Sequence, residues 1–212
     1  MDKNFIINIG RQLGSGGRSI ADILAHHYNI TAYDRKLIEL AAKESGLSQE
    51  FFENADEKKS HGFFHSIFSN RVAANALGSN DSYLSNDALF KVQSDIIRDL
   101  AEKESCIFIG RCADYVLRDY PNCLNVFISA NEEDRVKRIM EACKVEEKEA
   151  TRLMRNGDSN REAYYNFYAS SRWGEAKTYD LCINSSVLGI EKTADFIEEF
   201  ANKLMPKTEG VV

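Results

Sequence analysis

The sequence is poor in proline and contains no internal repeat, which excludes collagen-like, repeat and low-complexity classes. Its 212 residues include only two prolines, and hydrophobic and charged residues make up 43% and 28% of them. This is the composition of a folded protein and not of a disordered chain. The length favours one sizeable α/β core with small attached pieces over two large independent domains.

The sequence also lacks long apolar runs and an excess of positive charge. No stretch approaches the roughly 18 apolar residues of a membrane span, and the apolar run in the first ten residues is too short for a signal peptide. The net charge of -6 argues against a nucleic-acid polymer or an anionic membrane as a general partner. An anion-binding site must therefore be a local basic cluster.

The cysteines show no paired pattern. The five cysteines are an odd number without a C-x-x-C pair, which fits neither a disulfide framework nor a zinc ribbon. A reducing cytoplasm is the location that this usage predicts.

Short apolar runs alternate with helical patterns along the chain. The runs predict five buried strands, at 5–9, 30–33, 106–109, 124–129 and 181–184. Helical spacing follows at 19–28, 35–43, 85–103 and 113–119, and within the charged segment 131–177. Strands that alternate with helices predict an α/β fold with a five-stranded parallel sheet, whose ligands bind beyond the carboxyl ends of the strands.

Two parts of the chain receive no function from their pattern. Residues 57–84 are poorly patterned, and their aromatic and aliphatic side chains either pack on the core or line a cover over a substrate: Phe63, Phe64, Ile67 and Phe68. Residues 206–212 are expected to form a frayed tail.

A glycine-rich loop lies between the first predicted strand and its helix. It consists of Gly14, Ser15, Gly16, Gly17, Arg18 and Ser19. Backbone N–H groups and the helix N-terminus converge on an anion in such a loop. Against G-x-x-x-x-G-K-[ST], Gln12 replaces the first glycine and Arg18 the lysine, while Ser19 keeps the hydroxyl that suits Mg²⁺. A tight turn without a ligand is the alternative.

Two further candidates follow other predicted strands. Asp34 follows the second strand, where a carboxylate holds Mg²⁺-bound water or accepts a proton from an acceptor group, or else caps the next helix. Arg111 follows the third strand, and Gly110 before it permits close backbone approach. Arg111 is therefore predicted to bind a second phosphate, with an exposed salt bridge to Asp114 as the alternative.

The charged segment carries Arg152, Arg155 and Arg161 together with Asp158, and Asn156-Gly157 predicts a break among them. A break would give a hinged lid whose arginines close on a transferring phosphate and exclude water. Solvated ion pairs along a helix are the alternative.

Five blocks of sequence together resemble the cytidylate-kinase-like family of P-loop nucleoside-monophosphate kinases. They are IGRQLGSGGRSIA, YDRKLI, GRCADYVL, RNGDSNREAYY, and YDLCIN followed by IEKTADFI, in that order across nearly the whole chain. The resemblance implies a P-loop NTPase fold in a single kinase domain, 1–205. Within it, the resemblance implies a helical acceptor-binding insertion at about 35–104 and an arginine-rich lid at about 144–177.

The resemblance also implies roles for residues. ATP and Mg²⁺ would bind at 14–19, Arg111 and Asp114 would form the acceptor site, and Arg138 would bind phosphate. The expected substrate-binding set is Asp34, Arg111, Asp114, Arg138 and Asp158. Arg18, Asp34, Arg155 and Arg161 would form the catalytic set. Cys112 stands directly after Gly110-Arg111, where cytidylate kinases have aspartate.

The implied activity is phosphoryl transfer from ATP to a nucleoside monophosphate, with CMP or dCMP the first candidate. A catalytically weak nucleotide sensor or scaffold of the same fold, or a kinase for another small acceptor, is the alternative. The implied partners are small nucleotides, and the sequence leaves the oligomeric state open.

Overall fold

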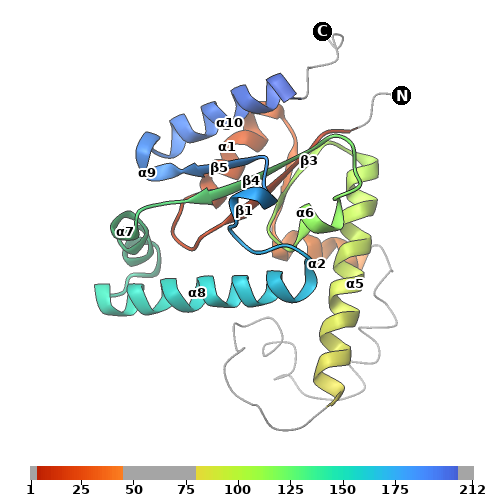
Figure 1. Cartoon of the computed structure of the whole chain (residues 1–212), viewed down its shortest axis with the longest axis horizontal. Coiled ribbons are helices and arrows are strands. Elements are labelled where there is room, and N and C mark those ends of the chain that lie inside the picture. Colours follow the sequence, from red (N-terminus) through yellow and green to blue (C-terminus); the bar gives the residue numbers. More distant parts are fainter. Residues whose placement is uncertain (1–3, 45–79, 205–212) are drawn as a thin grey trace. The chain divides into compact units, whose positions relative to one another are not determined.

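The computed structural model describes residues 4–44 and 80–204 (Figure 1). The described residues fall into two compact units: 4–35 together with 97–204, and the described part of 36–96. The aromatic stretch from Phe63 to Phe68 and the tail at 206–212 lie outside the described residues, so the predictions made for them stay predictions.

The first unit contains a five-stranded sheet in which all neighbouring strands are parallel. Its strands are β1 (Ile6–Arg11), β2 (Thr31–Tyr33), β3 (Cys106–Ile109), β4 (Cys123–Ser129) and β5 (Leu181–Asn184). The order β2-β3-β1-β4-β5 puts β1 in the centre, between β3 and β4. The predicted five-stranded parallel sheet is confirmed.

Helices lie between these strands and after the last one. They are α1 (Gly17–Tyr28), α6 (Ala113–Val116), α7 (Glu132–Cys143), α8 (Glu147–Tyr168), the short 3₁₀ turn η1 (Ala176–Thr178), α9 (Ser185–Leu188) and α10 (Ile190–Leu204). Two more, α2 (Arg35–Glu44) and α5 (Asn80–Lys103), belong mostly to the second unit. Among the described helices, α9 and α10 lie beyond the helical segments that the pattern predicted.

The core forms because alternate residues of each strand face the same side of the sheet. Ile7 and Ile9 of β1 are almost fully buried with Leu24 of α1 and Ile197 of α10. Figure 1 shows α1 and α10 together over one face of the sheet. This packing fixes the start of α1, and with it the glycine loop, at the end of β1.

Helix α8 runs without interruption through Asn156 and Gly157, so the break predicted there is wrong. Gly157 serves close packing instead, because a Cβ at this position would lie 2.6 Å from Cδ2 of Leu13, the residue before the glycine loop. Apolar side chains of α7 and α8 hold the two helices together, among them Ile139 and Met154. The helix thus lies against the loop along its middle turns.

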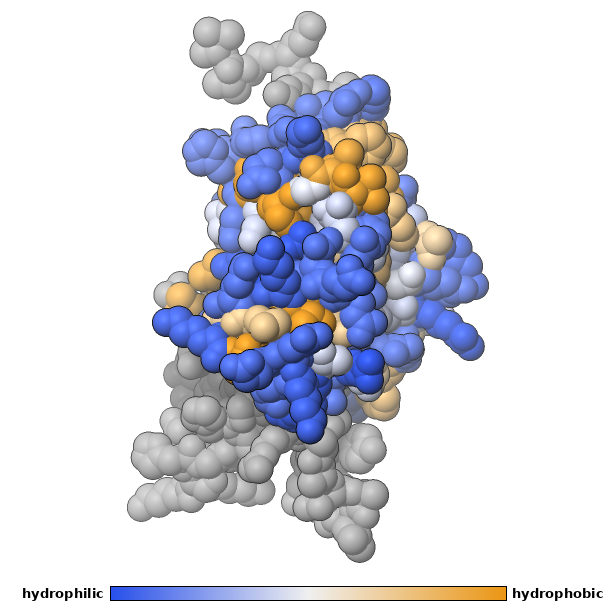
Figure 2. Space-filling model, turned by 90° about the vertical axis from the view of Figure 1, so that its left-hand side faces the viewer, coloured by the Kyte–Doolittle hydropathy of each residue, from blue (hydrophilic) through white to orange (hydrophobic). Residues whose placement is uncertain are grey.

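The outer side of α7 and of the first turns of α8 is mainly hydrophilic, with smaller apolar patches (Figure 2). Acidic residues lie there beside Lys137, including Glu132, Glu133 and Glu147. In the part of the chain described here, no helix is both long and apolar enough to cross a membrane.

Candidate phosphate-binding site

The site lies where the loops after β1 and β3 leave the sheet side by side. The two strands are parallel neighbours in which Ile9 pairs with Ile109, and the N–H of Gly110 donates to the Ile9 carbonyl oxygen at 3.0 Å. A Cβ at Gly110 would lie 1.9 Å from Nη1 of Arg11. The guanidinium of Arg11 therefore lies directly against the second loop. A crevice between parallel neighbours is where ligands bind in such sheets.

The glycine loop is shaped by left-handed glycines and by Ser15. Gly14 and Gly16 have φ of 78° and 79°, which residues with a side chain rarely adopt. Ser15 is fully buried, and its hydroxyl donates to the Gln12 carbonyl oxygen at 2.9 Å, while Ser185 Oγ donates to the Ser15 carbonyl oxygen at 2.7 Å. Ser15 thus holds the loop, and α1 begins directly after it. The first N–H groups of a helix have no acceptor inside the helix and bind anions.

Helices α7 and α8 anchor the same loop. Arg135 is buried, donates from Nε to the Leu13 carbonyl oxygen at 2.8 Å, and pairs with Asp158. Asp158 accepts the Leu13 N–H at 2.7 Å, and Arg138 donates to the Gly14 carbonyl oxygen at 3.1 Å. Asp158 and Arg138, predicted to bind substrate, therefore contact the loop backbone. A direct contact with substrate stays a prediction for both.

Arg18 and Asp34, which were predicted separately as site residues, form an ion pair. Arg18 of α1 donates from Nη1 to Asp34 and from Nε to Asp22 at 3.2 Å. The hydrogen bond to Asp34 is the largest cause that raises the pKa of Arg18 above its usual value. Arg18 stays more than half exposed, and Ser19 beside it is exposed in the first turn of α1. Both side chains are therefore accessible to a ligand.

Arg111 is aimed by a strained turn. Gly110, Arg111 and Cys112 have φ of 75°, 61° and 55°, a left-handed run in which the two residues with side chains carry strain. The Arg111 guanidinium lies 4.9 Å from the ring centre of Tyr164 on α8, a cation–π contact. Burial raises the pKa of the Cys112 thiol to about 12, so this side chain is neutral at pH 7.

Asp114 is engaged in a buried network. Tyr165 donates its hydroxyl to Asp114 and also lies 3.0 Å from Ser171 Oγ. Burial raises the pKa of Asp114 above its usual value, whereas the Tyr165 hydrogen bond acts in the opposite direction. The sequence offered no mechanism for Tyr164-Tyr165. In the structure one ring lies under Arg111 and the other binds Asp114.

Four guanidiniums influence one another at this edge of the sheet. Burial, Arg161 and Arg111 lower the pKa of Arg11 to about 9, with Arg18 adding to the effect and Asp34 opposing it. Arg161 of α8 donates to the Arg11 carbonyl oxygen at 3.4 Å, and burial lowers the pKa of Arg161 as well. Three carboxylates accompany these four cations, Asp22 and Asp34 beside Arg18 and Asp158 beside Arg161. A cluster in which cations outnumber carboxylates fits a polyanion such as a nucleotide phosphate chain. The sequence analysis missed Arg11 and Arg135.

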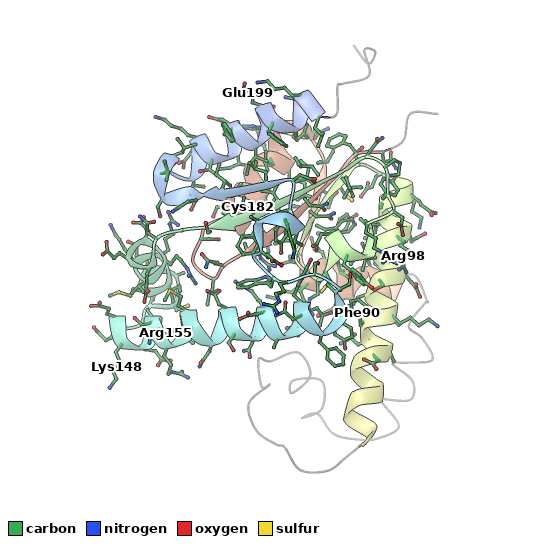
Figure 3. All side chains as sticks on the ribbon, in the orientation of Figure 1. Phe90, Arg98, Lys148, Arg155, Cys182 and Glu199 are labelled. Atoms are coloured by element: carbon green, nitrogen blue, oxygen red, sulfur yellow. The ribbon has the colours of Figure 1, made fainter. Side chains whose placement is uncertain are left out.

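Arg155 stands outside this cluster. It lies in the first half of α8, near Lys148 (Figure 3), and its side chain is 72% exposed. Its Nη2 lies 3.6 Å from Oε1 of Glu132 on α7. The described conformation does not bring it to the phosphate loop, so its catalytic role stays a prediction.

The donor set around the loop fits magnesium held together with phosphate. Among residues 4–44 and 80–204, no three His, Cys, Asp or Glu side chains gather to hold a metal by themselves. Mg²⁺ commonly takes one or two protein oxygens and completes its shell with phosphates and water. The exposed Ser19 hydroxyl at the start of α1 and the Asp34 carboxylate beside Arg18 are two oxygens that could contribute to such a shell.

A family model described as "Cytidylate kinase-like family" matches residues 6–187. The chain belongs to the cytidylate kinase-like family. A crystal structure of an uncharacterized protein from Eubacterium ventriosum is 31% identical, with a TM-score of 0.70, and the match covers 94% of this chain and 99% of that one. No curated protein sequence matches this chain significantly.

Shikimate kinases are more distant structural neighbours of this member of the cytidylate kinase-like family. The enzyme from Bacteroides thetaiotaomicron is 12% identical, with a TM-score of 0.51 over 92% of this chain and 97% of that one. The enzyme from Acinetobacter baumannii, in complex with shikimate, is 10% identical, with a TM-score of 0.50 over 97% and 96%. These likenesses show the P-loop NTPase fold. Membership in the family supports nucleotide-dependent phosphoryl transfer as the general activity.

Proposed function

We propose that this chain transfers the γ-phosphate of ATP to a nucleoside monophosphate, with CMP or dCMP as the first candidate acceptor. One observation carries the proposal: the glycine loop and the Gly110-Arg111 loop adjoin, with Arg11 lying between them. Two phosphate-binding loops in contact are what a transfer between two phosphorylated molecules requires, because reacting groups must be held in line and close together.

The glycine loop is the proposed ATP site. When bound, Mg·ATP supplies the transferable phosphoryl group. The start of α1 and the Arg18 guanidinium would bind its phosphates, and Ser19 would contribute the hydroxyl for the metal. Arg18 would exchange its Asp34 contact for phosphate oxygens, which leaves the Asp34 carboxylate for metal-bound water or for the acceptor.

The second loop is the proposed acceptor site. Arg111 would bind the acceptor phosphate while its guanidinium rests on Tyr164, which limits the orientations of the guanidinium. Arg161, which donates to the Arg11 carbonyl oxygen, would stabilise negative charge on the phosphoryl group in transfer. These roles need no break in α8.

A second acceptor class is favoured by the state of Asp114. Its carboxylate accepts the Tyr165 hydroxyl in a buried network, and the neighbouring Cys112 thiol is neutral and 2% exposed. Neither group is therefore placed to read the edge of a base. A small acceptor other than a nucleotide is the alternative that this observation supports.

The deciding experiment is release of ADP from ATP with a panel of nucleoside monophosphates and, in parallel, of small hydroxylated acids. Stimulation by CMP or dCMP supports the proposal, stimulation by an acid alone supports the alternative, and no stimulation with any acceptor contradicts both. Arg18→Ala is expected to weaken ATP binding by about 10–100-fold, the effect of losing a charge-assisted hydrogen bond. Arg18→Lys, which keeps a compact charge, tests whether the loop requires the planar fork.

A further inference from the structure

The tripeptide Ile-Gly-Arg occurs twice in the chain, at 9–11 and at 109–111. The copies end neighbouring parallel strands in register, since Ile9 pairs with Ile109. Both arginines therefore leave the sheet at the same edge. The second copy carries the predicted acceptor residue Arg111, whereas Arg11 in the first copy has no role in the function proposed above.

The side chain of Arg11 crosses from one loop to the other. Its Cβ would lie 2.7 Å from a Cβ built on Gly17, the first residue of α1, and its Nη1 would lie 1.9 Å from a Cβ on Gly110. Both positions are glycine, and any side chain there would displace Arg11. The guanidinium is thus fixed at the junction of the two proposed phosphate sites.

The electrostatics of Arg11 are unbalanced in the ligand-free protein. Within the described part of the chain, no carboxylate lies at ion-pair distance from it, and the nearby Asp34 is paired with Arg18. Burial and two neighbouring arginines lower its pKa to about 9, which still leaves it protonated at pH 7. A partly buried cation beside other cations is costly unless an anion joins it.

We propose that Arg11 binds phosphate oxygens at the junction of the ATP and acceptor sites and supplies the bridging positive charge there. Its five N–H donors form a planar fork that suits two oxygens at once. Arg18, which stands at the lysine position of the loop, is held on the outer side by Asp22 and Asp34. The inference rests on the proposed function, which supplies the two phosphate sites and the nucleotide that would occupy them.

A purely structural role makes the opposite prediction about stability. If Arg11 only packed the two loops together, its removal would lower the Tm of the ligand-free protein. If Arg11 is instead a cation held for an anion, its removal should raise the Tm of the ligand-free protein. The pKa of Arg11 is lower in the folded than in the unfolded chain, so at pH 7, below both values, its charge destabilises the fold.

The test compares Arg11→Met with Arg118→Met, a matched change at an exposed arginine beside Asp119. Without ligand, Arg11→Met is expected to raise Tm by about 2–4 °C, and Arg118→Met to leave it nearly unchanged. Titration calorimetry with inorganic pyrophosphate and with ATP should show affinity reduced by about 10–100-fold in Arg11→Met alone. Arg11→Lys keeps a charge without the fork, and should fold like the parent and bind about 10-fold more weakly.

The outcomes separate this proposal from the proposed kinase function. Pyrophosphate binding that depends on Arg11, in a protein that no nucleoside monophosphate stimulates, supports the role of Arg11 and contradicts the kinase proposal. Parent-like binding and turnover in Arg11→Met and Arg11→Lys would overturn the role of Arg11 and leave the kinase proposal intact. A lower Tm in Arg11→Met with unchanged pyrophosphate affinity of Arg11→Lys would assign Arg11 to packing alone.

Discussion

Arg161 and Arg155 stand on the same helix in the same R-x-x-D-x-x-R pattern, yet their surroundings differ. Arg161 is 29% exposed and reaches the backbone of Arg11, whereas Arg155 is 72% exposed and faces Glu132 on α7. Two residues six positions apart on a helix point in directions that differ by about 120° around the helix axis. The two side chains therefore leave α8 on different sides. Asp158 lies between them and binds the glycine loop.

The difference between the two arginines arises because α8 is continuous. A break at Asn156-Gly157 would allow both arginines to turn toward one phosphate. The continuous α8 instead places one arginine at the Arg11 backbone and the other beside Glu132 on α7. We therefore expect different effects on turnover from substituting Arg161 and Arg155, although both are arginines of one helix.

The largest effect is expected for Arg161→Ala. If Arg161 stabilises charge in the transition state, turnover should fall by roughly 10²–10³-fold while ATP affinity barely changes. Steady-state kinetics together with calorimetry on ATP measure both quantities. Arg152→Ala, at an exposed arginine paired with Glu149 on the same helix, is the control and should keep parental turnover. Parental turnover in both variants would remove Arg161 from the mechanism.

Arg111→Ala should act on the acceptor. Loss of a charged hydrogen bond to phosphate is expected to weaken acceptor binding by about 10–100-fold and to leave ATP affinity near normal. Acceptor KM and ATP affinity are the readouts. A variant that lost ATP affinity alone would place Arg111 in the wrong site. Tyr164→Leu, which removes the ring under Arg111, should show a weaker form of the same defect.

The strands were predictable because buried parallel strands appear as short apolar runs that end at glycine or polar residues. Their order in the sheet was not, since nothing local to Ile9 or Ile109 records that they pair. The role of Arg11 follows from that pairing, although the repeated Ile-Gly-Arg was a visible signal. The candidate site residues Arg18, Asp34 and Arg111 lie beyond the carboxyl ends of the strands, as predicted. Asp34 and Arg111 closely follow strands, and Arg18 follows the loop after the first strand.

The sequence pattern does not identify residues whose role depends on contacts between distant segments. Arg135 resembles any helical arginine until α7 packs on the loop and its Nε meets the Leu13 carbonyl oxygen. Gly157 reads as a helix break because glycine has low helix propensity. The close approach of Leu13 decides otherwise.

Asp158→Asn should mainly affect stability. The change removes the charge that pairs with the buried Arg135 and weakens the hold on the Leu13 N–H, at a cost of about 1–3 kcal/mol. For a chain of this size, each kcal/mol lowers Tm by about 2–4 °C. Asp119→Asn, at a carboxylate that is 91% exposed, is the matched control and should melt like the parent. A raised acceptor KM with unchanged Tm would instead support the predicted substrate contact of Asp158.

The smallest effect is expected for Arg155→Ala, and it tests the comparison most sharply. In the described conformation the side chain makes one solvated contact with Glu132, and exposed pairs of this kind contribute about 0.2–1 kcal/mol. Turnover should therefore stay within about 2-fold of the parent, since a loss of 1.4 kcal/mol is needed for 10-fold. Tm should change by less than about 4 °C.

The predicted catalytic role of Arg155 gives a different result, because it requires the side chain to leave Glu132 and reach the transferring phosphate. Turnover in Arg155→Ala would then fall by more than 10-fold at unchanged ATP affinity. Glu132→Gln supplies the second arm, since it removes the charge that holds Arg155 on the outer face. If Arg155 acts only there, Glu132→Gln keeps parental turnover. If Arg155 moves to the phosphate, weakening its competing partner should raise turnover, and the Arg155→Ala, Glu132→Gln double variant should lose that gain.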